Sequence, residues 1–316
     1  MKNDSRRNFI RKAGLLSAAI PFAGSAMMGW TPSHRRESLD VHIFSKHLQF
    51  LDYKETGEIA AKLGFAGVDL TVRPDGHVLP ENVKNDLPRA VKTIQDAGSR
   101  CELITTNVES IHVSVDVNVI RTAAMLGIKY YRSNWFSFPE DQSMPEALEN
   151  YSQQIKELSE LNRECGIIGC YQNIKGIKVG SSFWEVKKIL ERADPAFFGS
   201  EFDIRHATLE GANSWENAVR LLHPHIKTIV IKDFKWGMID GKWEAINTPV
   251  GEGMVNFTRY FSLLKQYGIA PPVTLHIEYP IGGAEHGDRE LSIDKEKVYA
   301  AMKNDLDAIQ KMWKDA

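Results

Sequence analysis

The sequence predicts an α/β fold, a (β/α)8 TIM barrel of eight parallel strands that alternate with helices. A recurring joint carries this prediction: a helix with apolar residues three to four positions apart ends in glycine, and a β-branched or aromatic run follows. The joints stand at Gly64, Gly98, Gly127, Gly166 and Gly268. Strand-like runs start roughly thirty to forty residues apart, as one strand–helix unit requires. No GxGxxG motif follows the first run, which argues against a dinucleotide-binding sheet.

Each element can be placed in order along the chain. Strands are expected at Val41–Phe44, Gly67–Thr71, Cys101–Thr105, Ile128–Arg132, Ile167–Gln172, Gly199–Asp203, Thr228–Lys232 and Val273–Glu278. Helices are expected at Tyr53–Leu63, Leu87–Ala97, Val117–Leu126, Pro145–Cys165, Ser182–Arg192, Trp215–His223, Asn256–Tyr267 and Ser292–Trp313. The strands of a parallel barrel end at one common face, which carries the active site in such folds. We therefore expect the functional residues at these strand ends.

The N-terminal segment has the layout of an export signal. A basic stretch, Ser5 to Lys12, begins with paired arginines, and an apolar run from Ala13 to Ala26 with small residues near its end follows. We expect a twin-arginine signal peptide over residues 1–30, a linker over 31–37 and a single barrel domain over 38–316. A basic amphipathic start to a cytoplasmic protein is the alternative. The apolar run is too short for an ordinary membrane span, so the expected product is periplasmic, without a stable membrane anchor.

The charge distribution and the cysteine spacing argue against nucleic-acid binding and against a cysteine-based zinc site. The chain has a net charge of −2, and its first 26 residues carry five basic residues against one acidic, which leaves the remainder near −6. An acidic body of this kind lacks the basic field that nucleic-acid binding needs, so no nucleic-acid partner is expected. Cys101, Cys165 and Cys170 show no CxxC or zinc spacing. The oligomeric state stays open, a homodimer being one alternative.

Polar motifs at the strand ends carry a resemblance. They are the D-x-x-H of Asp203 and His206, the Lys232–Asp233 pair, the GEG of Gly251–Gly253 and the IEYP that contains Glu278. In this order, the motifs resemble the sugar phosphate isomerase/epimerase family of xylose isomerase-like barrels over about residues 38–312. The resemblance implies an isomerase or epimerase that acts on a small-molecule carbohydrate.

The resemblance also implies a divalent metal, manganese, zinc or magnesium, among four strand-end ligands. Asp203 and Glu278 match two of them, but Gln172 stands where a glutamate is expected and Val230 where a histidine is expected. The remaining ligand set would be Asp203, Glu278, Gln172 and His206. Two carboxylates with an amide oxygen and an imidazole leave metal binding an open alternative.

The altered positions change the expected chemistry. Glutamine cannot accept or return a proton, so epimerisation with a base on each face is not expected of Gln172. One-base chemistry remains: Glu278 or Lys232 removes a proton next to a carbonyl, and the Lys232 charge stands in for a metal by stabilising an enolate. His206 is the third catalytic candidate. For Lys232–Asp233, a structural ion pair at the barrel rim is the alternative.

Five further residues are candidates for substrate binding. They are His47, Asn107, Arg132, Asn173 and Trp236. Trp236 lies with Trp243 in the long loop after the seventh strand, where an indole could stack on a sugar ring, and simple loop anchoring is the alternative. For His47 the alternative is an exposed loop histidine.

Together these observations predict an exported barrel enzyme that abstracts a proton next to the carbonyl of a sugar or keto-sugar. Two alternatives stay open: a keto-glycoside lyase or dehydratase with a single base, and a non-catalytic carbohydrate-binding barrel with a degenerate metal site. An apurinic endonuclease is disfavoured, because the sequence shows neither a rich set of histidine ligands nor a basic groove.

Overall fold

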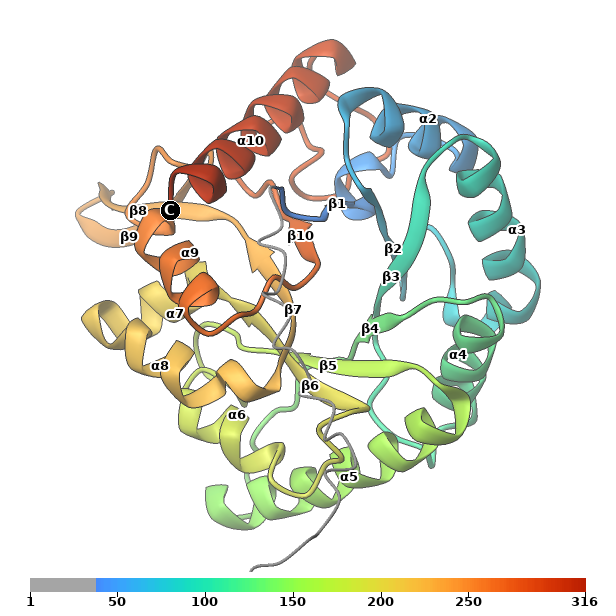
Figure 1. Cartoon of the computed structure of the whole chain (residues 1–316), viewed down its shortest axis with the longest axis vertical. Coiled ribbons are helices and arrows are strands. Elements are labelled where there is room, and N and C mark those ends of the chain that lie inside the picture. The colour runs from blue at the N-terminus through green and yellow to red at the C-terminus, as the bar shows by residue number, and fades with distance from the viewer. Residues whose placement is uncertain (1–37) are drawn as a thin grey trace, which may run out of the picture. The chain divides into compact units, whose positions relative to one another are not determined.

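The computed structural model describes residues 38–316, which form a closed barrel of parallel strands surrounded by helices (Figure 1). The strand order around the barrel is β1-β10-β7-β6-β5-β4-β3-β2. The barrel strands are β1 (Val41–Phe44), β2 (Gly67–Val72), β3 (Arg100–Thr106), β4 (Tyr130–Arg132), β5 (Ile168–Gln172), β6 (Phe198–Asp203), β7 (Ile226–Ile231) and β10 (Val273–Leu275). The predicted fold class is confirmed. The predicted signal peptide and linker lie outside the described residues.

The helices pack around the outside of the strands (Figure 1). They are α2 (Tyr53–Leu63), α3 (Val83–Asp96), α4 (Ser114–Met125), α5 (Met144–Cys165), α6 (Phe183–Ile189), α7 (Ile204–Gly211), α8 (Trp215–Leu222), α9 (Phe257–Gln266) and α10 (Lys295–Asp315). The caps fix where they begin and end: Asp52 and Glu55 form a capping box on α2, and Gly64 ends it with a φ of 90°. None of the described helices has the length and apolarity to cross a membrane.

Side chains alternate between the two faces of each strand, which separates an apolar shell from a polar interior. On β6, Phe198 contacts Tyr131 and Phe202 contacts Phe183 on the helix side. Glu201 therefore points inward, where its Oε1 accepts a hydrogen bond of 3.2 Å from Thr228. Asp203 lies two residues further on and points the same way. The alternation thus delivers charged side chains to the inside of the barrel and to its C-terminal mouth.

Two elements in the loops that follow the strands were not predicted. An antiparallel hairpin, β8 (Asp233–Ile239) and β9 (Lys242–Thr248), follows β7 directly, and α7 follows β6 directly. The eighth strand is also shorter than predicted, because β10 ends at Leu275 rather than at residue 278. Beyond it, the backbone N–H of Ile277 bonds to the His47 ring instead of to a neighbouring strand.

Candidate active site

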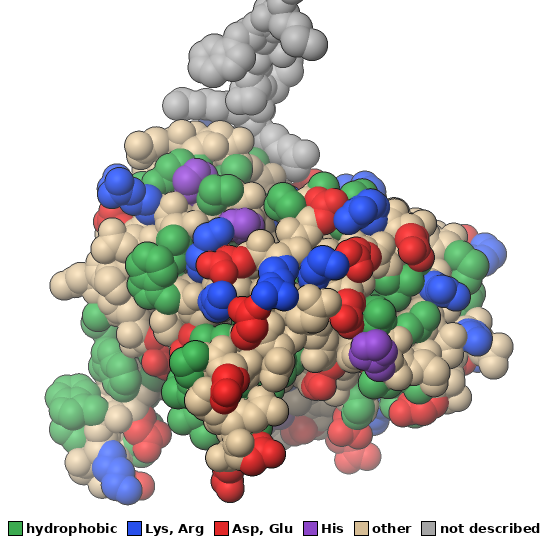
Figure 2. Space-filling model, turned by 90° about the horizontal axis from the view of Figure 1, so that it is seen from below, with side chains coloured by type: hydrophobic (Ala, Val, Ile, Leu, Met, Phe, Trp, Pro, Cys, Tyr) green, Lys and Arg blue, Asp and Glu red, His purple; other side chains and the backbone are tan. Residues whose placement is uncertain are grey.

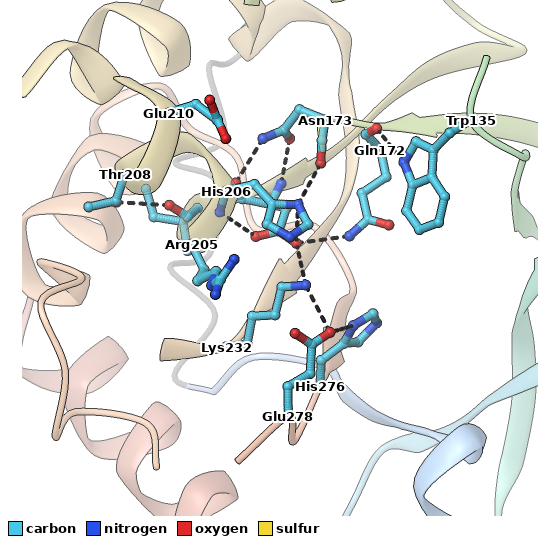
Figure 3. A network of polar contacts seen from close by, with 12 residues as sticks. Trp135, Gln172, Asn173, Arg205, His206, Thr208, Glu210, Lys232, His276 and Glu278 are labelled. Carbon is cyan, nitrogen blue, oxygen red and sulfur yellow. Dashed lines mark hydrogen bonds and ion pairs between the residues drawn. The ribbon is translucent and has the colours of Figure 1, made fainter. Parts of the chain in front are cut away.

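Lys232 lies at the centre of a polar cluster at the C-terminal mouth of the barrel (Figure 3). Its Nζ is 3.0 Å from Glu278 Oε1 and 3.2 Å from Asp203 Oδ2. Lys232 is 4% exposed and Asp203 is fully buried, so the ammonium and this carboxylate neutralise each other away from solvent. Lys232 directly follows β7. Its two partners come from the end of β6 and from the segment after β10.

The pKa values of both carboxyl groups are held below their ordinary range. Burial alone would raise the pKa of Glu278, but the Lys232 charge and the neighbouring His276 ring outweigh burial and hold it well below 4.5. At Asp203, burial is likewise outweighed by the neighbouring His206 and Lys232, and the pKa is lowered. Both groups are therefore ionised at neutral pH.

Asp203 is fixed at the junction of β6 and α7. Its Oδ1 accepts the backbone N–H of His206 at 2.9 Å and so caps α7, while its Oδ2 accepts Gln172 Nε2 at 2.8 Å. The Asn173 amide holds the Asp203 backbone from both sides, through bonds of 2.7 and 2.9 Å. The D-x-x-H spacing that the sequence shows is thus the spacing of a helix N-cap and its third residue.

His206 is a neutral imidazole whose Nε2 remains available to accept a hydrogen bond. Its Nδ1 lies 3.0 Å from the Asn173 carbonyl and 3.3 Å from Asp203 Oδ2. Because both neighbours are acceptors, the proton resides on Nδ1 and Nε2 carries a lone pair. Burial lowers the pKa of His206 to about 3, although Asp203 opposes the shift. The side chain lines the cavity of the site.

His276 was missed in the sequence, although its position gave a signal. It precedes Glu278 by two residues, so both side chains point to the same side of the chain. His276 Nδ1 is 3.7 Å from Glu278 Oε1, and the ring stacks on Phe44 at 4.3 Å between centroids. Burial lowers the pKa of His276 to about 4, which keeps it neutral. Phe44 and His276 together form an apolar wall beside the Glu278 carboxylate.

Asp233 does not pair with Lys232, so the alternative of an ion pair between them is wrong. Consecutive strand residues point to opposite sides, and the Asp233 carboxylate accepts four backbone N–H groups instead. They come from Phe234, Gly251, Gly253 and Val255, at 2.8 to 3.2 Å. A Cβ on Gly253 would stand 2.3 Å from Asp233 Oδ1, which explains the glycine. The GEG motif is therefore a backbone cradle for Asp233.

Gln172 is committed to protein partners through both ends of its amide. Its Oε1 accepts Arg132 Nη1 at 3.2 Å, while its Nε2 donates to Asp203. The Arg132 guanidinium also lies 4.1 Å above the Trp135 ring, and Trp135 donates to the Gln172 carbonyl at 3.0 Å. Gln172 thus links Arg132, at the end of β4, and Trp135, in the loop after it, to Asp203.

The arrangement does not fit the divalent metal that the resemblance implied. Among residues 38–316, no group of three or more His, Cys, Asp or Glu side chains is arranged to hold an ion. The Lys232 ammonium takes the position between the Asp203 and Glu278 carboxylates. The Gln172 oxygen is bonded to Arg132, and His206 Nδ1 carries a proton. The predicted ligand set of Asp203, Glu278, Gln172 and His206 is therefore not arranged around an ion: the two carboxylates pair with the Lys232 ammonium, and Gln172 and His206 bond to protein groups.

A cavity of about 190 Å³ opens at this cluster. It is lined by Phe44, Lys46, Arg73, Arg132, Trp135, Gln172, Ile174, Lys175, His206, Lys232, His276 and Glu278. Five of the predicted site residues are among them: Gln172, His206, Lys232, Glu278 and Arg132. Lys46 and Lys175 were not predicted, and nothing in their local sequence marks them.

The other predicted residues lie elsewhere. His47 is fully buried, and both of its ring nitrogens are occupied, by Ala284 O at 3.0 Å and by the Ile277 N–H at 2.9 Å. These bonds hold the segment after β10 in place. His47 does not line the cavity, so the prediction of substrate contact is corrected. Asn173 bonds to the backbone of Asp203 and does not line the cavity. Asn107 is half-buried and Trp236, on the hairpin, is 44% exposed; neither lines the cavity.

Residues 58–296 match the xylose isomerase-like TIM barrel family, and the chain belongs to this family. No curated protein matches the sequence.

Several solved structures share the fold. D-psicose 3-epimerase of Clostridium cellulolyticum H10 with D-tagatose is similar with a TM-score of 0.65 and 12% identity, over 87% of this chain and 99% of that one. The IolI protein with a bound zinc atom has a TM-score of 0.66 and 17% identity, over 86% and 99%. The apo form of 3-keto-D-glucoside 4-epimerase YcjR from E. coli has a TM-score of 0.62 and 10% identity, over 84% and 97%. At these identities the likeness shows the fold.

Proposed function

We propose that this barrel is an enzyme that removes a proton from the carbon next to the carbonyl group of a keto-sugar, without a metal ion. The observation that carries the proposal is the Lys232 ammonium between two ionised carboxylates, of which only Glu278 lines the cavity. A fixed positive charge beside an ionised base is what enolate formation requires. Family membership and epimerase neighbours support a reaction on sugars.

The roles follow from the geometry. Glu278 accepts the proton from the carbon next to the carbonyl, since its carboxylate is ionised and reaches the cavity. Lys232 Nζ, 3.0 Å from Glu278 Oε1, donates to the substrate oxygen on which negative charge develops. Asp203 remains fully buried and holds the ammonium in place. His206 accepts a substrate hydroxyl at its free Nε2 and orients the ring.

The fate of the enolate separates two reactions that share this first step. Return of the proton from Glu278, to the same or to the neighbouring carbon, gives exchange or isomerisation. Loss of a substituent from the carbon beyond the enolate gives elimination, in which the proton taken up by Glu278 passes to the departing oxygen. The first step is common to an isomerase and a keto-glycoside lyase, so it is the step to test.

Solvent exchange tests that first step directly. We would incubate the protein in D2O with D-fructose, D-tagatose and 3-keto-D-glucose and follow loss of the α-proton signal by NMR. We expect exchange in the wild type and a loss of at least about 100-fold in Glu278→Gln, the size of effect that a general base contributes. Glu164→Gln, at an exposed position, should exchange like the wild type.

Binding without exchange would overturn the proposal. If the wild type binds these sugars and Glu278→Gln binds them equally, with no exchange in either, the barrel is a carbohydrate-binding protein. Appearance of an unsaturated product alongside exchange would assign the lyase.

We also propose that the protein is exported by the twin-arginine route to the periplasm. The paired Arg6 and Arg7 ahead of the apolar run support this. Replacing both with lysine should leave the full-length chain in the cytoplasmic fraction, whereas the unchanged sequence should yield a shortened periplasmic product. Equal periplasmic yield from both would contradict the proposal.

A further inference from the structure

The cavity is far more basic than the chain as a whole. Five of its lining side chains are Lys or Arg, and Glu278 is the one carboxylate among the described lining residues. The full sequence, by contrast, has a net charge of −2. Lys232 is balanced by Asp203 and Glu278. The remaining cations, Lys46, Arg73, Arg132 and Lys175, exceed what neutralising Glu278 would need.

Several basic residues on the outer helices have acidic partners. Basic and acidic side chains lie next to one another on the side that Figure 2 shows, and close ion pairs on the outer helices include Lys156–Glu160 at 2.7 Å and Lys188–Glu149 at 3.2 Å. Lys46, Arg73 and Lys175 have no acidic partner within 4.0 Å in the part of the chain that the structure describes. Unlike unpaired surface lysines such as Lys235, they lie around one cavity. Three unpaired cations around one cavity indicate that the missing partner is a ligand.

Partial burial makes the charges of Lys46 and Arg73 costly, whereas Lys175 is exposed. Burial is the main cause that lowers the pKa of Lys46, and Arg73 and Lys232 add repulsion against the attraction of Glu278. Burial likewise lowers the pKa of Arg73, and for Lys175 the neighbouring Arg205 adds to the effect of burial. A bound anion would reduce both the repulsion and the desolvation cost.

Lys46 and Arg73 are positioned as a pair. Lys46 lies in the short helix η1 (Ser45–Leu48) that follows β1, and Arg73 directly follows β2, its neighbour in the barrel. The Arg73 guanidinium lies 5.4 Å from the centre of the Phe44 ring, which leaves its edge donors for a ligand. Phe44 also stacks on His276 beside Glu278. The pair therefore stands on the same wall of the cavity as the proposed base.

A further buried arginine adds to the positive potential. Arg205 is 1% exposed, and its Nε and Nη1 have no hydrogen-bond partner among the described residues. Its Nη2 donates to Asn247 at 2.8 Å, and Asn247 donates in turn to the Glu278 carbonyl at 3.1 Å. Arg205 thus stands next to the cluster, one residue before His206 (Figure 3).

We propose that the substrate is an anionic sugar, and that Lys46 and Arg73 bind its oxyanion group while Lys175 contributes from the opposite side. The proposal deepens the proposed function and rests on it for the sugar and for the reacting carbonyl. A carboxylate, as in a uronic acid, and a sulfate or phosphate ester share the required chemistry.

Binding to the full-length protein tests the inference without turnover. We would titrate D-glucose, D-glucuronate, D-glucose 6-sulfate, D-glucose 6-phosphate and inorganic sulfate by calorimetry at low salt. We expect at least one charged sugar to bind about tenfold tighter than D-glucose, since a hydrogen bond to a charged group is worth that much. The ranking of carboxylate, sulfate and phosphate identifies the natural group.

Charge-removing variants give the matched comparison. Arg73→Gln and Lys46→Gln should each weaken the charged sugar about tenfold and leave D-glucose within about twofold. Lys235→Gln removes the same charge from the exposed hairpin and should change neither. Equal affinity for D-glucose and every charged sugar overturns the inference, as does a loss of the same size in Lys235→Gln. Inorganic sulfate that binds as tightly as the sugars also overturns it, because the cavity would then hold only an adventitious ion.

The two proposals fail in different ways. If neutral keto-sugars exchange their α-proton as fast as anionic ones, the anion inference is wrong and the proposed reaction stands. If no sugar exchanges, yet D-glucuronate binds in an Arg73-dependent manner, the proposed reaction is wrong and anion recognition stands.

Discussion

Lys232 lies between the two carboxylates of the site, so replacing it should lower the free energy of unfolding. Lys232→Met leaves the fully buried Asp203 without its ammonium partner, so we expect a loss of about 3–5 kcal/mol in unfolding free energy at pH 7. Adding Asp203→Asn should recover part of this loss, because the uncompensated charge is gone. Urea unfolding of both variants measures the coupling. Lys235→Met serves as the exposed control, and simple additivity of Lys232→Met and Asp203→Asn would contradict the pairing.

Glu201 predicts a distinct pH dependence of stability. Burial, reinforced by Asp69, raises the pKa of Glu201 to about 8. A carboxyl with a raised folded-state pKa stabilises fully below its unfolded value of 4.5, and this stability is lost as pH rises to 8. Asp69 acts in the same direction, but only up to its pKa of about 6. The contribution of Glu201 to the unfolding free energy should therefore fall by about 2 kcal/mol between pH 6 and 8. The buried histidines, whose pKa values are lowered, act in the opposite direction near pH 6.5, so Glu201 must be isolated by comparison with a variant.

The glutamine variant isolates this effect. Glu201→Gln keeps an oxygen that can accept from Thr228 but cannot ionise, so its stability relative to the wild type should increase by about 2 kcal/mol from pH 6 to pH 8. Glu164→Gln should follow the wild-type curve. A difference between Glu201→Gln and the wild type that stays constant from pH 6 to 8 would show that Glu201 is already ionised in the folded state.

At the residue level, the sequence revealed which side chains meet but not how they bond. Strand-end position was enough to bring Asp203, Lys232 and Glu278 together, since parallel strands end at one face. It also suggested that the Lys232 charge could stand in for a metal, but it could not reveal that the Gln172 amide is oriented by Arg132. His47 was predicted to contact substrate, with an exposed loop position as the alternative, and neither is found, because its two backbone partners lie more than 200 positions away in the sequence.

At the element level, the junction of β7 and β8 couples the hairpin to the site. Gly253→Ala would place a Cβ 2.3 Å from both Asp233 Oδ1 and the Phe234 carbonyl. The four-bond cradle of Asp233 must then open, so we expect a loss of about 2–3 kcal/mol and reduced proton exchange, because Lys232 precedes Asp233. Thermal unfolding and the exchange assay measure both.

The hairpin turn supplies the comparison for this substitution. Gly241 has a φ of 78° and open space around its Cα, so Gly241→Ala adds only backbone strain of about 1 kcal/mol. Exchange should be unaffected there. An equal loss of activity in the two variants would show that the hairpin as a whole matters, rather than the cradle.

The elements that the sequence predicted poorly are those whose signal is weak locally. The hairpin follows β7 without a break, and its strands expose Trp236, Met238 and Trp243, so no burial pattern marks them. The helices, by contrast, were predicted to within a few residues at most ends because glycine and capping residues stand there. Gly166, for example, ends α5 in the left-handed conformation, with a φ of 75°.

At the scale of the whole molecule, the charge arrangement predicts independence from divalent metal. Dialysis against EDTA should leave both unfolding temperature and proton exchange unchanged, since Lys232 occupies the position between the carboxylates. Elemental analysis of the purified protein should find less than about 0.1 divalent ion per chain, because the donor set does not fit one. A stoichiometric ion that disappears in Asp203→Ala would contradict this account.

Because the positive group of the proposed site is the side chain of Lys232, it is assembled together with the polypeptide. A lysine side chain cannot be chelated, exchanged for a competing ion or limited by supply in the surroundings. The barrel acquires its positive centre in the act of folding, when β6, β7 and the segment after β10 come together.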